Sequence, residues 1–517
     1  MPAPALFPPG MKANPYSGAA LRRSAWHFLS GKGISALLTL ALLLWLVRLL
    51  PVAEYGAYVT LVAGMEIMLA VARIGLPWMA SRYLPEYRLH APGVRIAGLV
   101  AQFVSLHAGA LTGFALLFWL LLPPYLAWAG LGAYDEASRL YLLVLLAEGI
   151  GSFVREPILG LLMQQGVGRA SLVLRQLSFL TLLAGLALEG QVHLIDVVRA
   201  ELAASIVGSL VALAGLGRHV STLRALPGQP AWREPRWPEM WRVAWNMHAA
   251  HMLTLLYSPQ ILTVLIQRAL GAEATAVFGF MRNLYQQIAH NLPAQLMISL
   301  VRPKLVASYV SGGIGELTRN ANLVGKLSLF IVFPLLAVAG LGSENIIALL
   351  SGGKFGHTGW LFFGFMLTLV PLSQQRILET VAVASGQSNL CTWAAASGVL
   401  ILPVMLGLMQ AGLGLWSAII ALLVGQTQFN AILLTGLVRA TDYRPDMIAP
   451  LKMTASSVVA YLITANSLGW IGDGMFLLFV QMAVISMCYL LMAMLTKPFG
   501  EDERKRLNSL LRGRLFV

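Results

Sequence analysis

The stretch Arg48-Leu49-Leu50-Pro51-Val52-Ala53-Glu54-Tyr55-Gly56 separates two long apolar runs, and it predicts the fold. The first run, 25–50, follows two arginines, and the second, 57–80, ends close to a second polar stretch, 82–88. Each run has about 20 residues, which is enough for a helix to cross the ~30 Å of hydrocarbon in a bilayer. Arginines at both outer ends mark one side of the membrane, so the whole stretch predicts a helical hairpin.

The composition extends this prediction to the whole chain. Of 517 residues, 58% are hydrophobic and only 11% are charged, and the mean hydropathy is +0.73. Soluble domains carry about 25% charged residues, and the apolar runs lack the alternation of membrane β-strands. Helices are the remaining way to satisfy the backbone in lipid. The chain is therefore predicted to be an all-α polytopic membrane protein of about 14 transmembrane helices.

Charge placement predicts the orientation of these helices and excludes one class of partner. Among the loops on the side opposite the N-terminus, only Arg268 and Lys354 are basic, so both termini are predicted to be cytoplasmic. The net charge of +14 is spread over short loops, and no contiguous basic domain could follow a nucleic-acid backbone. The predicted helices are 25–50, 57–80, 96–122, 138–162, 170–188, 194–217, 243–266, 276–300, 323–342, 359–383, 391–410, 415–437, 452–467 and 474–496.

An internal repeat predicts two homologous halves. A shift of 220 residues places Arg48-Leu-Leu-Pro51 on Arg268-Ala-Leu-Gly271, and the same shift places 165–169 on 385–389. Equal orientation of the two halves makes them parallel repeats. The predicted domains are a cytoplasmic lead (1–24), an N-lobe bundle (25–217), a cytoplasmic linker (218–242), a C-lobe bundle (243–437), two extra helices (452–496) and a cytoplasmic tail with a short surface helix (497–517).

Charged residues inside the predicted spans are the candidate functional residues. A charge at mid-bilayer costs roughly 2.5–3.5 kcal/mol on the insertion scale, so these side chains should face a wet interior or one another. The candidates for a cationic, substrate-binding cavity are Lys32, Arg73, Arg175 and Arg282, with internal pairing as the alternative for each. The candidates for gating or ion coupling are Glu66, Glu148, Arg155, Glu156, Arg376 and Glu379.

Some of these charges have simpler interpretations. Arg155 and Glu156 lie towards a helix end and could form a structural gate pair. Arg199 and Glu201 are expected to snorkel or to pair near a helix end. The sequence shows no metal-ligand spacing, phosphate-binding loop or nucleophile triad, so neither an enzyme nor a cofactor or metal site is predicted.

The order of the motifs resembles a known family. The stretch 48–58, followed by Gly75-Leu76 and Arg82-Tyr-Leu-Pro-Glu-Tyr87, resembles the opening hairpin of Wzx-type polysaccharide flippases. These belong to the MOP superfamily with the MATE drug exporters and the lipid II flippase. The segments 265–284, 349–355 and 386–389 are similar to elements of the second half in that family. The resemblance covers about 20–440.

The resemblance implies a two-lobed transporter of the bacterial inner membrane with a central cavity. Its substrate would be an undecaprenyl-diphosphate-linked oligosaccharide, moved by alternating access for exopolysaccharide, capsule or O-antigen assembly. Cationic side chains would neutralise the diphosphate, and an apolar groove would carry the polyprenyl tail among membrane lipids. A polysaccharide polymerase and a chain-length regulator are further candidate partners.

Two other functions stay open. One is a cation-coupled multidrug or small-molecule exporter of the MATE type, in which Glu66, Glu148 or Glu379 would carry protons. The other is a membrane enzyme such as a polymerase or ligase, which the short loops disfavour because such enzymes tend to carry a large external loop.

Overall fold

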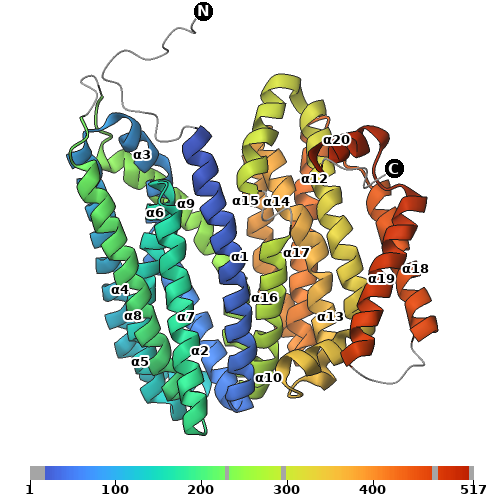
Figure 1. Cartoon of the computed structure of the whole chain (residues 1–517), viewed down its shortest axis with the longest axis horizontal. Coiled ribbons are helices and arrows are strands. Elements are labelled where there is room, and N and C mark those ends of the chain that lie inside the picture. Colours follow the sequence, from blue (N-terminus) through green and yellow to red (C-terminus); the bar gives the residue numbers. More distant parts are fainter. Residues whose placement is uncertain (1–17, 228–231, 293–297, 469–474, 512–517) are drawn as a thin grey trace, which may run out of the picture. The chain divides into compact units, whose positions relative to one another are not determined.

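The structure, a computed structural model, describes residues 18–227, 232–292, 298–468 and 475–511, and within these ranges all regular elements are helices (Figure 1). Two compact units emerge from the contacts along the chain. Unit 1 comprises Met1–Leu255 and Thr263–Thr275, and unit 2 comprises Leu256–Leu262 and Ala276–Val517. Most of the predicted lead, 1–17, and the end of the predicted tail, 512–517, lie outside the described residues.

Unit 1 holds the following elements, in chain order: α1 (Gly18–Leu49), α2 (Val52–Ala72), α3 (Leu76–His90), α4 (Gly93–Ala129), η1 (Gly132–Tyr134), α5 (Asp135–Phe153), the π-helix η2 (Val154–Ile158), α6 (Leu159–Leu161), α7 (Gln165–Glu189), α8 (Leu194–Leu223) and α9 (Trp237–Leu255). The helix α10 (Pro259–Asn291) has parts in both units.

Unit 2 continues with the remaining elements: α12 (Ile298–Ser351), η3 (Gly356–Thr358), α13 (Gly359–Leu367), α14 (Leu369–Ala384), α15 (Ser388–Ser397), η4 (Gly398–Leu400), α16 (Ile401–Gln410), α17 (Trp416–Ala440), α18 (Ile448–Leu468), α19 (Met475–Thr496) and α20 (Glu501–Leu511). The last of these is the short helix predicted in the charged tail.

The helices agree with the predicted fold class. In the described residues, thirteen helical stretches are long and apolar enough to cross a membrane. One of them, Trp237–Asn291, is 55 residues long and contains both the seventh predicted span and most of the eighth. The predicted all-α polytopic membrane protein, with two repeated bundles and two extra helices, is confirmed.

Several predicted spans are broken where proline or glycine stands. The predicted helix 57–80 ends at Ala72, because Ile74 (φ 38°) and Gly75 (φ 79°) turn the chain before α3 begins. A second break falls inside the predicted span 243–266, where Ser258 caps a new helix that starts at Pro259. Proline suits the first turn of a helix because its missing N–H needs no partner there. Hydropathy alone predicts one span in each case, since the flanking residues stay apolar.

Each unit has its own apolar core. In unit 1, Leu76 of α3, Phe103 of α4 and Phe153 of α5 are at most 1% exposed and lie in one cluster, together with Ala244 of α9. In unit 2, a cluster between α12, α14 and α17 contains Leu317, Val381 and Leu433, each fully buried. Close van der Waals packing of this kind is the main force that holds helices together in lipid.

The boundary between the units differs from the predicted domain boundary. The segment 218–242 is predicted to link the lobes; α9 begins inside it at Trp237, packs against α3 and belongs to unit 1. At Gly75, the backbone of α9 comes so close that a Cβ atom would lie 2.2 Å from the carbonyl oxygen of Ala244. The other predicted domain limits stay a prediction.

Candidate functional site

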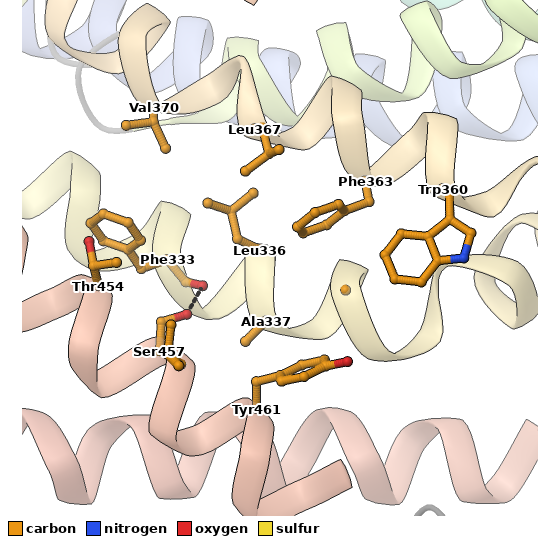
Figure 2. Close-up of a pocket in the computed structure, with 12 residues that line it drawn as sticks. Phe333, Leu336, Ala337, Trp360, Phe363, Leu367, Val370, Thr454, Ser457 and Tyr461 are labelled. Carbon is orange, nitrogen blue, oxygen red and sulfur yellow. Dashed lines mark hydrogen bonds between the residues drawn. The ribbon is translucent and has the colours of Figure 1, made fainter. Parts of the chain in front are cut away.

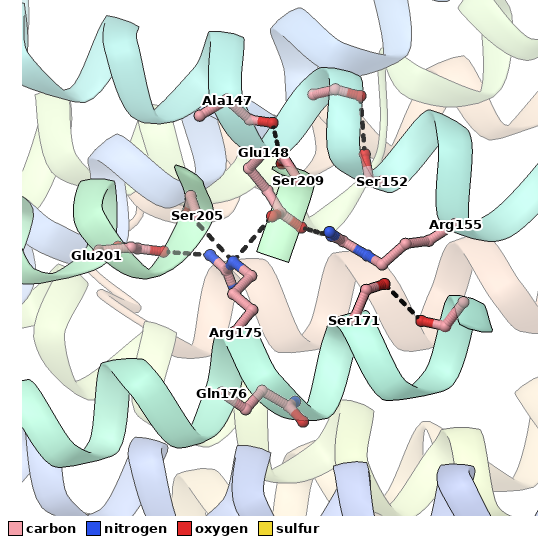
Figure 3. A network of polar contacts seen from close by, with 12 residues as sticks. Ala147, Glu148, Ser152, Arg155, Ser171, Arg175, Gln176, Glu201, Ser205 and Ser209 are labelled. Atoms are coloured by element: carbon pink, nitrogen blue, oxygen red, sulfur yellow. Dashed lines mark hydrogen bonds and ion pairs between the residues drawn. The ribbon is translucent and has the colours of Figure 1, made fainter. Parts of the chain in front are cut away.

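Four charged side chains meet inside unit 1. Arg175 of α7 lies between two carboxylates, with its Nε 2.8 Å from Glu148 Oε2 and its Nη2 3.0 Å from Glu201 Oε1 (Figure 3). Arg155, in η2, donates through Nη2 to the other oxygen of Glu148. The four side chains are only 4–13% exposed. We call this set the unit-1 ion network.

Hydroxyl groups complete the coordination of the unit-1 ion network. The hydroxyl groups of Tyr58 and Tyr141 donate to Glu201 Oε2 over 3.0 and 3.3 Å, and their rings meet edge to face. Arg175 Nε also donates to Ser205 Oγ, over 3.1 Å. The two positive and two negative charges balance, and buried charges are tolerated when they are paired and hydrogen-bonded in this way. The network connects α2, α5, η2, α7 and α8 through ion pairs and hydrogen bonds.

Small residues make the close approach of these helices possible. A Cβ atom on Gly151 of α5 would lie 2.1 Å from Ser209 Oγ, and one on Gly208 of α8 would lie 2.7 Å from Arg175 Cβ. In place of side chains there, Ser209 Oγ donates to the carbonyl oxygen of Ala147 over 2.6 Å. Small residues of this kind bring helix backbones together in membranes, and here they also let α8 reach the charges.

Two polar residues of the first span, Ser35 and Thr39, contact the same bundle. Gln176, next to Arg175, donates to Thr39 Oγ1 of α1 over 2.7 Å and to the carbonyl oxygen of Ser35 over 3.3 Å. The α1 helix is therefore attached to α7 through amide and hydroxyl groups one residue away from the ion network.

Arg73 differs from the network arginines because it has no matching acid. It is the last residue before the break between α2 and α3, and it is half-buried. Among the described residues, no carboxylate forms an ion pair with it. Its nearby titratable groups are His107 of α4 and His251 of α9, on which its charge acts. The break therefore holds a cation whose charge the described part of the bundle does not neutralise.

Two other predicted cavity cations, Lys32 and Arg282, have their own surroundings. Lys32 of α1 is partly buried and lies near Arg169 of α7, whose Cβ packs over the neighbouring Gly31. Arg282 of α10 is only 1% exposed and belongs to unit 2. Both make polar or electrostatic contacts within the protein. Their assignment to one cationic cavity stays a prediction.

The predicted gating residues have mixed surroundings. Glu66 is partly buried and makes a polar or electrostatic contact within the protein. Glu379 of α14 accepts hydrogen bonds from Gln375 over 3.0 Å and from Arg376 over 3.1 Å, and Arg376 is 47% exposed. These three form a local helical cluster, and their role in ion coupling stays a prediction.

The structure shows how these charges pair. Arg155 forms its ion pair with Glu148, while its neighbour Glu156 is exposed, because adjacent residues on a helix point in different directions. For Arg199 and Glu201 the structure shows pairing: Arg199 pairs at the surface with Glu136 over 3.3 Å, and Glu201, 4% exposed, pairs with Arg175 inside the network. The i, i+4 spacing of Glu201 and Ser205 is the signal that could have indicated an inward polar face.

The chain is similar to known proteins in its sequence and in its fold. The chain matches the family model described as "Polysaccharide biosynthesis protein" over residues 21–301. No curated protein matches it significantly. Among solved structures, the chain is similar to the lipid II flippase MurJ in its inward closed conformation, with a TM-score of 0.65 and 14% identity over 90% of this chain and 98% of that one.

Two further similar structures are drug transporters. A multidrug resistance MATE family transporter of the MOP superfamily, in its inward-facing conformation, gives a TM-score of 0.56 and 14% identity over 78% of this chain and 94% of that one. A mutant of the Vibrio cholerae MATE transporter VcmN gives 0.53 and 16% identity over 81% and 97%. These likenesses establish the transporter fold. Because the family model covers more than half of the residues, the chain belongs to the polysaccharide biosynthesis protein family.

Proposed function

We propose that this protein flips undecaprenyl-diphosphate-linked oligosaccharide repeat units across the bacterial inner membrane by alternating access, for exopolysaccharide, capsule or O-antigen assembly. Family membership and the transporter fold support a transport role rather than catalysis. The placement of basic residues supports cytoplasmic N- and C-termini. A polysaccharide polymerase and a chain-length regulator would act on the product at the outer face.

The observation that carries the proposal is the unmatched cation at Arg73. A diphosphate brings negative charge into a region of low dielectric, where an opposite charge is most effective. Arginine suits this role because its planar guanidinium can donate two parallel hydrogen bonds to phosphate oxygens. Lys32 and Arg282 are proposed to act with it, and Arg175 has the weakest support because two carboxylates already match its charge.

A groove in unit 2 supports a place for the polyprenyl chain. It has a volume of about 310 Å³ and runs between α12, α13, α14 and α18 (Figure 2). The lining is apolar and aromatic, including Phe333, Leu336, Trp360, Phe363 and Tyr461. The Ser457 hydroxyl donates to the carbonyl oxygen of Phe333 over 2.8 Å and so is satisfied (Figure 2). An isoprenoid chain would meet a mainly apolar wall there.

Complementation of a deletion strain tests the proposal. Wild type should restore surface polysaccharide, and Arg73→Ala should reduce export at least tenfold, roughly the loss of one charge-assisted contact. Arg73→Lys should recover part of that loss, because lysine keeps the positive charge but cannot donate the two parallel hydrogen bonds of a guanidinium. Arg199→Ala is the matched control, since Arg199 is 60% exposed and paired at the surface. Quantitative immunoblots of membranes would show that all variants are inserted.

Two outcomes would count against the proposal. Full export by Arg73→Ala, at normal protein level, would contradict the assignment of Arg73 to the substrate-binding site. Unchanged polysaccharide together with new drug sensitivity in the deletion strain would favour the alternative, a cation-coupled exporter of the MATE type. That alternative rests on the carboxylates within the spans, among them Glu379, whose side chain is 17% exposed.

A further inference from the structure

A second cavity lies in unit 2, between α12, α14, α17 and the segment that leads into α18. Its volume is about 340 Å³, within the range typical of sites for small ligands. Unlike the apolar groove described above, its lining includes polar and charged side chains, among them Lys326, Gln374, Asn430 and Asp446. Neither the cationic cavity nor the polyprenyl groove uses these residues.

Three charged side chains at the cavity, Lys326, Asp446 and Glu503, carry a net negative charge. Lys326 Nζ lies 2.6 Å from Asp446 Oδ2 and 2.8 Å from Glu503 Oε2 of α20. One ammonium group therefore faces two carboxylates, and the three side chains together carry about one excess negative charge. The lysine is 8% exposed, while Asp446 is 32% exposed. An additional cation near Asp446 would complete the charge balance.

The amide groups in the lining present acceptors. Asn430 Nδ2 donates to the carbonyl oxygen of Pro371 over 2.6 Å, and Gln374 Nε2 donates to that of Gly325 over 3.4 Å. Gln374 Nε2 also donates to Ser373 Oγ over 3.1 Å. Asn430 Oδ1 is buried and receives no hydrogen bond from the described residues. A buried acceptor without a donor costs free energy unless a ligand or water supplies one.

Apolar side chains also line the cavity. Leu329, Ile377 and Leu434 are among them, and Val370 is shared with the apolar groove. A ligand that fills the cavity would therefore join a cationic, hydrogen-bond-donating group to a hydrocarbon chain. The cavity disfavours a headgroup with a net negative charge, because Lys326 is already paired with Asp446 and Glu503.

We propose that this cavity binds one aminophospholipid molecule. Its primary ammonium donates to Asn430 Oδ1 and lies close to Asp446 and Glu503, and an acyl chain follows Leu329 towards Val370. Phosphatidylethanolamine has this chemistry. Phosphatidylcholine has the same charge but no N–H donor, and phosphatidylglycerol has no cation, only neutral hydroxyl donors. Comparison of phosphatidylethanolamine with phosphatidylcholine therefore tests the donor, and comparison of both ammonium lipids with phosphatidylglycerol tests the charge.

Lipid retention by the full-length purified protein tests the proposal. Protein in detergent is incubated with equal amounts of the three lipids, and bound lipid is counted by native mass spectrometry. Wild type should retain one phosphatidylethanolamine about tenfold more strongly than phosphatidylcholine, the effect of one hydrogen bond from a charged donor. Asn430→Leu should remove this preference. Asn466→Leu, an exposed asparagine near the other end of α18, is the matched control and should keep it.

A second pair of variants tests the charge independently of Asn430. Glu503→Gln makes the triad neutral, so retention of both ammonium lipids over phosphatidylglycerol should fall severalfold. Glu501→Gln removes an exposed carboxylate from the same helix and should change nothing. Equal retention of all three lipids by wild type, or wild-type preference in both Asn430→Leu and Glu503→Gln, would overturn the proposal. Neither result bears on the proposed flippase activity, because the readout is binding alone.

Discussion

Replacement of Arg175 by leucine should destabilise unit 1 more than any single surface change. The substitution removes both ion pairs of the α7 guanidinium and leaves Glu148 and Glu201 buried, at 12% and 6% side-chain exposure. Removal of one partner from a buried pair costs about 3–5 kcal/mol. The lower value is expected, because Glu201 keeps two tyrosine hydroxyls and Glu148 keeps Arg155.

Thermal unfolding in detergent measures this cost. A loss of about 3 kcal/mol should lower the melting temperature by roughly 10 °C for a unit of this size. Arg199→Leu removes an arginine that is 60% exposed and should change stability by less than about 1 kcal/mol. Equal shifts for the two variants would refute the structural interpretation of the ion network, and Arg175 would then regain its place among the candidate substrate-binding cations.

Two further predictions concern the backbone and the loops of unit 1. Gly75→Ala should destabilise the protein by at least about 2 kcal/mol in chemical unfolding, because φ is 79° and the new Cβ meets the carbonyl of Ala244. Gly98 has open space around it, so Gly98→Ala should be neutral or stabilising. A similar loss of stability in both variants would contradict this prediction. His193 Nδ1 lies 3.1 Å from Glu54, and this hydrogen bond raises the pKa of His193, so its contribution is complete below about pH 6.5 and disappears as the pH rises through the raised value. The melting temperature of wild type relative to His193→Gln should therefore fall as the pH is raised, and a pH-independent difference would exclude the link.

Hydropathy and charge placement predicted the helices, because a bilayer imposes length and apolarity on every span. They could not predict the break at Gly75 or the one before Pro259, since neither interrupts the apolar run. The break at Gly75 depends on how closely α9 approaches, whereas the break before Pro259 coincides with a capping serine and a proline. The distance from Gly75 to the carbonyl of Ala244, 169 residues later, is not encoded in any local pattern.

The candidate site was predictable in composition but not in pairing. Expensive charges inside spans indicated that Glu148, Arg155 and Arg175 face one another or water. Which side chains meet depends on the rotation of each helix, and the π-helix at Val154–Ile158 changes that rotation where Arg155 stands. The part played by Tyr58 was missed, because an aromatic residue in a span is common and only the position of Glu201 gives it a role.

Because of the internal repeat, the residues of the ion network in the first half can be compared with the corresponding residues in the second half. At the shift of 220 residues, Glu148, Arg175 and Glu201 correspond to Thr368, Ala395 and Ala421, so the second half folds alike without these charges. The fold therefore does not require the network. Buried ion pairs contribute little net stability compared with apolar packing, but they penalise every arrangement that separates them. Retention of four such charges in one half only suggests that unit 1 must keep one fixed arrangement of its helices while an unmatched cation, Arg73, is presented at its helix break.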